Sequence, residues 1–213
     1  MSSKNICIGG RLRENETFFG GIRKNKIVSS PLDKIKDGHE FQQIIAEYFR
    51  SLKNDDHEFN FTDINVLDFG VGCDDGCDIL VEFFFEDAIC KHSQKWIVEC
   101  KSHKKAIGPD LVNTNKIFST IDAKGASGYL LVCKNDATAS LKRKFNECSV
   151  ESKKKFIIWN GSQLWHKFIK RKSLIQAFFL EYYQEKFQDN NAEKKYNELV
   201  KKFENKISEE GKK

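Results

Sequence analysis

The sequence predicts an α/β fold with a central mixed β-sheet, helices on both of its faces and an added C-terminal helical segment. An amphipathic helix pattern spans residues 38–52. Two β-rich runs, 78–86 and 95–101, then fit a hairpin. Strand and helix patterns alternate after the hairpin, which adds parallel strands to the antiparallel pair.

Length and composition favour one compact domain with an appendage. The chain has 213 residues, of which 39% are hydrophobic and 18 are phenylalanine, so it can bury a substantial core. We expect an N-terminal arm or edge hairpin over 1–37, a core domain over 38–172 and a helical extension over 173–213. The extension reads as a helical hairpin or one long broken helix that packs on the core, forms a homo-oligomer or contacts a partner protein.

The chain lacks the patterns of membrane, secreted and zinc-finger proteins. No run approaches the ~18 apolar residues that span a bilayer, and the first ten residues have no apolar signal region, so we expect a cytoplasmic protein. Its seven cysteines are then free thiols. Cys73 and Cys77 form the closest pair, but no second Cys/His pair at finger spacing completes a structural zinc site.

The first half of the domain predicts a helix, a strand and the hairpin. Asp37 is expected to cap the first helix. A short strand follows over 64–69, then a turn rich in glycine and aspartate, and the stretch 88–94 is polar enough to turn the chain between the hairpin strands. The apolar stripe of the first helix consists of Phe41, Ile44, Ile45, Tyr48, Phe49 and Leu52.

The second half alternates helices with short apolar strands. Pro109 fits the first turn of a helix that runs to Ile121. The continuous apolar run 128–133 predicts a strand covered on both faces. A helix over 137–148 and a strand over 156–159 follow. Asn160-Gly161 ends that strand, and Ser162 is expected to cap a helix that runs to Lys170.

The hairpin carries the residues most suited to chemistry. Asp78 opens its first strand, while Glu99 and Lys101 lie two residues apart near the end of the second and therefore share a face. An antiparallel register brings Asp78 beside them. Two carboxylates and the backbone carbonyl of Cys100 can bind a hard divalent cation, Mg²⁺ with Mn²⁺ as a substitute. Lys101 could then orient or deprotonate a water that attacks a phosphate. The alternative is an ordinary cross-strand ion pair.

The order of these motifs resembles the PD-(D/E)XK nuclease superfamily, and within it the Mrr-like restriction endonuclease domain. The resemblance spans roughly residues 36–171. Its motifs, in chain order, are 38–42 (GHEFQ), 75–78 (DGCD), 98–101 (VECK), the pair 125–131 and 134–141, and 157–164 (IIWNGSQL).

The resemblance implies a restriction-endonuclease-like fold and a metal-dependent endonuclease that cuts double-stranded DNA, with a role in defence against foreign DNA. It assigns Asp78 and Glu99 as metal ligands and Lys101 as the catalytic lysine. At the position of the family's first-helix glutamate this chain has Gln42, so Glu40 or Glu47 could substitute. Asp75 is either an outer-sphere contact of the metal or a turn residue.

Clustered cations indicate where DNA phosphates would bind. The formal net charge is +5, and residues 153–172 contain seven Lys or Arg and no acid. A solvated lysine-rich surface is the alternative interpretation. The residues expected to contact DNA are His103, Lys104, Lys105, Lys142, Arg143, Lys153, Lys154, Lys155 and Lys167.

Two other functions fit the same pattern. One is a catalytically inactive nuclease fold that binds DNA or acts as a scaffold, and the intact Asp-Glu-Lys set argues against it. The other is a structure-specific resolvase or an RNase, since one metal site can serve any phosphodiester and the substrate is set by groove shape and 2′-hydroxyl contacts.

Overall fold

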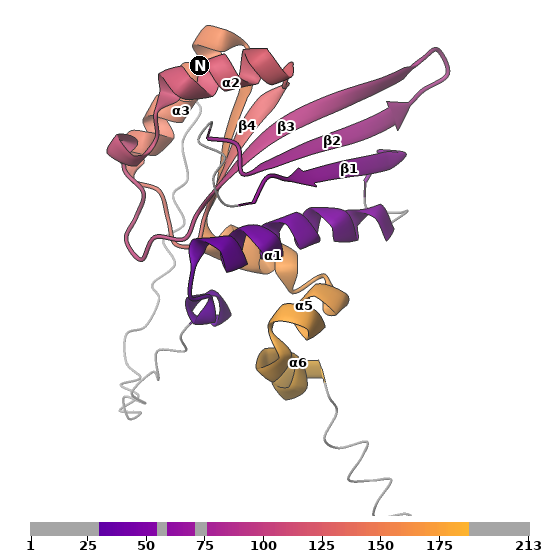
Figure 1. Ribbon diagram of the computed structural model, residues 1–213, viewed down its shortest axis with the longest axis vertical. Helices are drawn as coiled ribbons and strands as arrows, with labels where there is room; N and C mark the ends of the chain where they lie inside the picture. Colours follow the sequence, from indigo (N-terminus) through magenta and orange to yellow (C-terminus); the bar gives the residue numbers. More distant parts are fainter. Residues whose placement is uncertain (1–29, 55–58, 71–75, 188–213) are drawn as a thin grey trace, which may run out of the picture.

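A five-stranded mixed sheet forms the centre of the molecule (Figure 1). The computed structural model describes residues 30–54, 59–70 and 76–187. The strands follow one another in chain order across the sheet; the first three are antiparallel and the last three parallel, so the predicted α/β fold with a mixed sheet is confirmed. They are β1 (Asp63–Asp68), β2 (Ile79–Glu86), β3 (Lys91–Lys101), β4 (Gly128–Cys133) and β5 (Lys155–Trp159).

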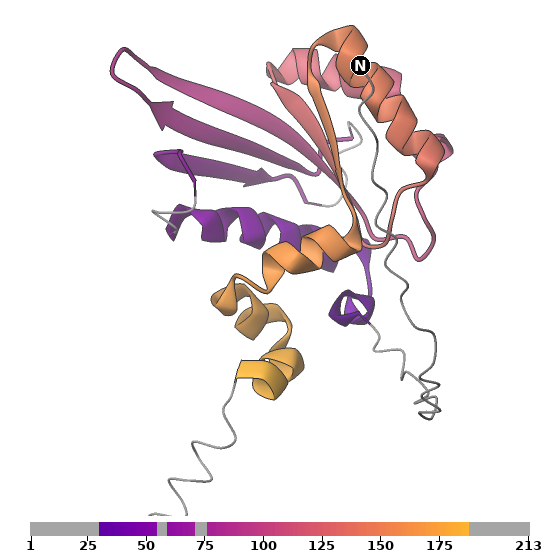
Figure 2. The same ribbon diagram turned by 180° about the vertical axis from the view of Figure 1, so that it is seen from behind.

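Helices cover both faces of this sheet, as Figures 1 and 2 show from opposite sides. One face packs on α1 (Gly38–Ser51), α4 (Gly161–Phe168) and α5 (Lys172–Phe178), with α6 (Leu180–Phe187) beyond them. The other face packs on α2 (Thr114–Lys124) and α3 (Ala139–Ser152). Within the described ranges there are also three short 3₁₀ turns, at Pro31–Lys34, Leu52–Asn54 and Pro109–Leu111.

The first helix forms as its sequence predicts. The Asp37 carboxylate accepts a hydrogen bond from the Glu40 N–H at 2.7 Å, which satisfies one of the free donors at the helix start. Its apolar stripe is buried against the sheet, and Phe41 is completely inaccessible to solvent. Burial of this stripe, more than intrinsic helix propensity, stabilises a helix of this length.

Strand β4 is the central element of the core. All six of its residues are buried, as the continuous apolar run predicts. Leu130 and Val132 pack on the side of α1, whereas Tyr129 and Leu131 pack on the side of α2 and α3. The alternation follows from the two-residue period of a strand, and it gives Tyr129 a place under the second helical layer.

Several element boundaries differ from the predictions. The hairpin turn is confined to residues 87–90, and β3 begins at Lys91 because its polar first residues pair with β2 beyond the packed core. Pro109 starts only a 3₁₀ turn; α2 begins at Thr114, where the Asn113 side chain accepts from the Lys116 N–H at 3.2 Å. The predicted helix over 137–148 spans 139–152 instead.

The predicted N-cap of α4 was also wrong. Asn160, and not Ser162, caps this helix, through reciprocal hydrogen bonds with Gln163. Gly161 follows because the chain passes very close to the end of β4, where an added Cβ would lie 2.1 Å from the Lys134 carbonyl oxygen. The helix ends at Phe168 rather than Lys170.

The tail begins as two short helices. Leu174, Ile175 and Phe179 are buried in the core layer beneath α1, and the chain breaks helical geometry at Phe179, between α5 and α6. The rest of the predicted extension, and most of the predicted arm, lie outside the described residues. In the part of the chain that is described, no helix combines the length and apolar character required to cross a membrane.

Candidate active site

The hairpin register brings Asp78 beside Glu99. Ile79 pairs with Val98 across the two antiparallel strands, and the Asp78 N–H donates to the Val98 carbonyl at 3.0 Å. The Asp78 carboxylate then accepts a hydrogen bond from the Cys100 N–H at 2.6 Å. Asp78 therefore lies just before β2, with its side chain held against the backbone of β3.

Glu99 and Lys101 face the same side of the sheet and touch. The Lys101 ammonium lies 2.6 Å from one Glu99 carboxylate oxygen. The buried hydroxyl of Tyr129, on the neighbouring strand β4, donates to the other oxygen. Asp78 lies close to both, since its charge acts on the pKa of Glu99 and the charge of Lys101 acts on the pKa of Asp78. The hairpin thus brings the three residues into one neighbourhood.

Burial controls the electrostatics of the two carboxyls. Desolvation raises the pKa of Asp78, although the Cys100 N–H and the charge of Lys101 oppose it. Desolvation likewise raises the pKa of Glu99 against the hydrogen bond and charge of Lys101. The charge of Asp78 adds to the rise in the Glu99 pKa, whereas the charge of Lys116 opposes it.

The backbone carbonyl of Cys100 is directed toward the same place. The carbonyl of the next residue, Lys101, accepts from the Lys134 N–H on the β4 side. Successive strand carbonyls alternate, so the Cys100 carbonyl is directed to the β2 side, where Asp78 lies. A set of carboxylate and carbonyl oxygens suits a hard divalent cation.

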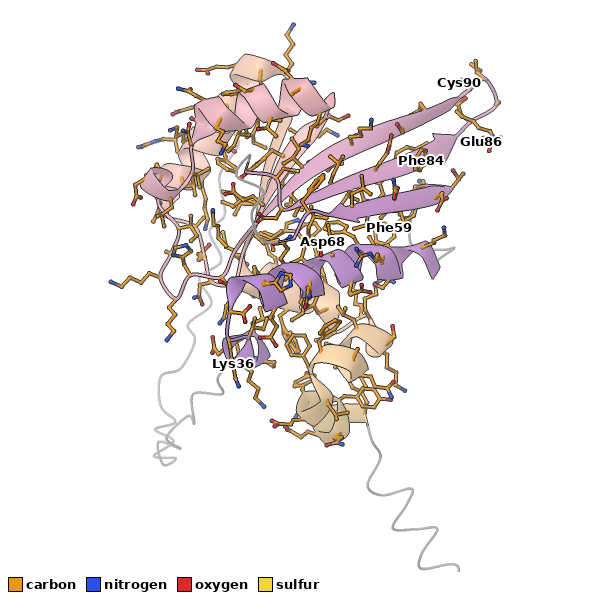
Figure 3. The ribbon with its side chains drawn as sticks, in the orientation of Figure 1. Lys36, Phe59, Asp68, Phe84, Glu86 and Cys90 are labelled. Atoms are coloured by element: carbon orange, nitrogen blue, oxygen red, sulfur yellow. The ribbon has the colours of Figure 1, made fainter. Side chains whose placement is uncertain are left out.

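A third carboxylate, Asp68, belongs to this neighbourhood and was not predicted. Figure 3 labels it at the end of β1, above α1. The Gln42 side-chain amide donates to the Asp68 carboxylate at 2.6 Å and to the Asp78 carbonyl at 3.1 Å. The charge of Asp68 also raises the pKa of Asp78. An acid at the inward position of β1, two residues after Val66, was the sequence signal for it.

The first-helix alternatives have other partners. Glu40 accepts from the Lys36 N–H at 2.9 Å, before the helix begins. Glu47 pairs with Arg50 one turn later at 2.5 Å. Gln42 is the first-helix candidate that the structure brings into contact with the Asp78 backbone. Asp75 lies outside the described residues.

The predicted DNA-contact residues fall at two ends of the sheet. His103, Lys104 and Lys105 are exposed just after Lys101 and line a hollow of about 420 Å³ with Thr138, the cap of α3. Lys142 and Arg143 follow in the first turns of α3 and pair with Asp136 at 2.9 Å and Glu147 at 4.0 Å. These five residues therefore lie at the end of the sheet that carries the site.

The second basic group lies at the opposite end. Lys155 pairs in register with Gly128, at the start of β4, whereas Lys101 pairs with Cys133 at its end. Five residues of strand separate the two levels by roughly 16 Å. Lys153 and Lys154 precede Lys155, and the Lys154 ammonium donates to the Ala126 carbonyl at 2.8 Å.

Lys167 is placed by an aromatic contact. Its ammonium lies 4.4 Å from the centroid of the Trp159 ring, on the α1 side of the sheet. This is a cation–π geometry, which stabilises the C-terminal part of α4 against β5. The face that carries Lys167 is opposite to that of Glu99.

A family model and two solved structures are similar to this chain. A family model described as a restriction endonuclease (Mrr_cat) matches residues 32–166. The solved structure of MspJI restriction endonuclease in complex with a 27-mer oligonucleotide is similar at a TM-score of 0.46 and 11% identity, covering 72% of this chain and 33% of that one.

The DNA modification-dependent restriction endonuclease AspBHI is similar at a TM-score of 0.43 and 10% identity, over 70% of this chain and 42% of that one. The chain thus spans less than half the length of either protein. No curated protein matches its sequence. The family match covers most of the chain, from the first 3₁₀ turn into α4 and including every strand. The chain belongs to the Mrr_cat family of restriction endonucleases.

Proposed function

We propose that this protein is a metal-dependent endonuclease that hydrolyses phosphodiester bonds of double-stranded DNA, in defence against foreign DNA. One observation carries the proposal: the hairpin register brings Asp78 close to Glu99, and Lys101 lies against Glu99. Family membership supports the nuclease activity and the DNA substrate.

Each residue has a distinct task in this reaction. Asp78, Glu99 and the Cys100 carbonyl would hold Mg²⁺, which supplies Lewis acidity and lowers the pKa of a bound water. The Lys101 ammonium would orient the attacking water and stabilise negative charge that develops on the phosphate. The Tyr129 hydroxyl fixes Glu99, and the Cys100 N–H and Gln42 fix Asp78, so that little reorganisation is needed.

Removal of metal or of Lys101 tests the proposal. Supercoiled plasmid incubated with the protein and Mg²⁺ is expected to be nicked and linearised, and EDTA is expected to stop the reaction. Lys101→Ala is expected to slow cutting by about 10²–10⁴-fold, since one positioned group contributes that much to such reactions. Unchanged cutting in EDTA, or by the Lys101→Ala protein, would contradict the mechanism.

The two basic groups predict different effects on DNA binding. Lys104→Ala with Lys105→Ala removes cations near the site and is expected to reduce the salt dependence of binding by about 0.9 per lost phosphate contact. Lys153→Ala with Lys155→Ala removes the same charge at the far end of the sheet and is the matched control. The slope of log K against log salt, from fluorescence anisotropy of a labelled duplex, measures both. A larger change in the second pair would place the DNA at the other end.

A further inference from the structure

A second group of metal-binding side chains lies at the tip of the β2–β3 hairpin. Asp87, Cys90 and His92 each present one ligand atom, and these carboxylate, thiol and imidazole atoms all lie within 4.8 Å of one another. All three side chains are exposed, so small rotations about their side-chain bonds can bring the atoms to the spacing of one metal shell. Figure 3 labels Cys90 at this tip.

The turn that carries these residues is already ordered by its own contacts. The Asp87 carboxylate accepts from the Ile89 N–H at 2.8 Å and the Cys90 N–H at 2.9 Å through one oxygen, Oδ1. The Asp87 N–H donates to the Cys90 carbonyl at 3.1 Å, which closes the turn. The turn therefore fixes two of the ligands relative to each other and uses a single oxygen of the carboxylate.

The third ligand is oriented from the neighbouring strand. The His92 ring stacks on Phe85, with centroids 5.2 Å apart and planes at 11°. Phe85 and His92 pair directly in the hairpin register, so this contact belongs to the sheet and does not depend on the turn. The stacking limits rotation of the imidazole and lowers the entropic cost of binding a metal.

The chemistry of these donors differs from that of the candidate active site. A thiolate, an imidazole and a carboxylate select a borderline transition metal over Mg²⁺, and among available divalent ions they favour Zn²⁺. His92 and Glu99 are seven strand residues apart, roughly 23 Å along β3. An ion at the tip therefore cannot share ligands with Asp78 and Glu99.

We propose that Asp87, Cys90 and His92 form a binding site for a transition-metal cation of the Zn²⁺ class, separate from the metal that serves DNA cleavage. Three protein ligands leave one position of a tetrahedral shell open. The site is independent of the proposed endonuclease activity, which uses neither these residues nor this class of ion.

Cobalt substitution tests the site directly. The full chain, kept reduced by a phosphine and freed of metals, is titrated with Co²⁺, whose bond to a thiolate gives a charge-transfer band in the near ultraviolet. One equivalent of Co²⁺ is expected to produce the band, Zn²⁺ to abolish it, and excess Mg²⁺ to leave it unchanged. Absence of the band in the wild-type protein would overturn the proposal.

Variants then assign the ligands. Cys90→Ser is expected to abolish the band. His92→Ala is expected to weaken Co²⁺ binding at least about 10-fold, since even indirect metal partners contribute 10–100-fold. Replacing Cys7 and Cys73 by serine controls for the two cysteines outside the described residues and is expected to keep the band. A band that survives Cys90→Ser would place the metal on another thiol and exclude this site.

Plasmid cleavage distinguishes this proposal from the endonuclease. Cys90→Ser is expected to cut at the wild-type rate in Mg²⁺, because Cys90 is exposed at the far end of β3. Loss of cutting by this variant, with an unchanged circular dichroism spectrum, would mean that the hairpin-tip site is not separate from the metal that serves cleavage. That result would overturn the proposal of a separate site.

Discussion

Asp78→Asn is expected to reduce Mg²⁺-dependent cleavage of plasmid DNA by about 10³-fold or more, since loss of a metal carboxylate removes several kcal/mol of transition-state stabilisation. The asparagine side chain has nearly the same shape, and its carbonyl oxygen can still accept from the Cys100 N–H. Its lower charge leaves the metal with Glu99 as the sole charged ligand of the pair. The initial rate of nicking of supercoiled plasmid measures the loss.

Glu82→Gln provides the matched control for this change. Glu82 lies on the same strand pair, accepts from the Ser93 hydroxyl at 2.6 Å and faces Lys95 at 3.8 Å, well away from the site. It loses the same charge and is expected to cut normally. Duplex binding by the Asp78→Asn protein is expected to persist, because the fold and the basic residues are unchanged. Cleavage by Asp78→Asn within about tenfold of the wild type would exclude Asp78 as a metal ligand.

Phe41→Ala is expected to lower the free energy of unfolding by about 3–5 kcal/mol, since truncation of a fully buried aromatic side chain loses its transfer free energy and leaves a cavity. Phe41 is 0% exposed and packs between α1 and the sheet. The loss is a large fraction of the ~5–15 kcal/mol that stabilises a typical domain. Urea denaturation followed by circular dichroism measures it, as a shift of the midpoint at constant slope.

Val150→Ala supplies the comparison for the core substitution. Val150 is 80% exposed on α3, so its removal creates no cavity, and the free energy of unfolding is expected to change by less than about 0.5 kcal/mol. If both variants lost the same free energy of unfolding, Phe41 would stabilise the fold no more than a surface residue does. That result would contradict the packing of α1 on the sheet.

The elements with strong periodic patterns were the ones that the sequence predicted well. The stripe of α1, the uniform burial of β4 and the shared face of Glu99 and Lys101 all follow from side-chain period alone. The predicted start of β3, at residue 95, was wrong. Lys91 and His92 are polar residues, and their strand geometry comes from pairing with β2 rather than from burial. The predicted helix start at Pro109 was wrong as well, because the backbone preference of proline also suits the 3₁₀ turn that forms there.

The supporting residues of the site could not be predicted from local pattern. Tyr129 reads as one more apolar residue of a buried strand until the parallel register, which pairs it with Ile97, brings its hydroxyl within reach of Glu99. Asp68 and Gln42 meet only because α1 crosses the end of β1, a tertiary contact between segments that are distant in sequence. Such partners depend on the fold as a whole, whereas the Asp78, Glu99 and Lys101 set depends on one hairpin.

That hairpin has a consequence for how the protein assembles. Closing a loop of roughly two dozen residues is enough to gather both acids and the amine, so the entropic cost of forming the cluster is small. The cluster can therefore arise early in folding, before the slower parallel pairing of β4, which requires the intervening α2 segment. The Tyr129 hydroxyl can donate to Glu99 only after β4 has paired. A chain in which Glu99 lacks this hydrogen bond would therefore be one whose sheet is still incomplete.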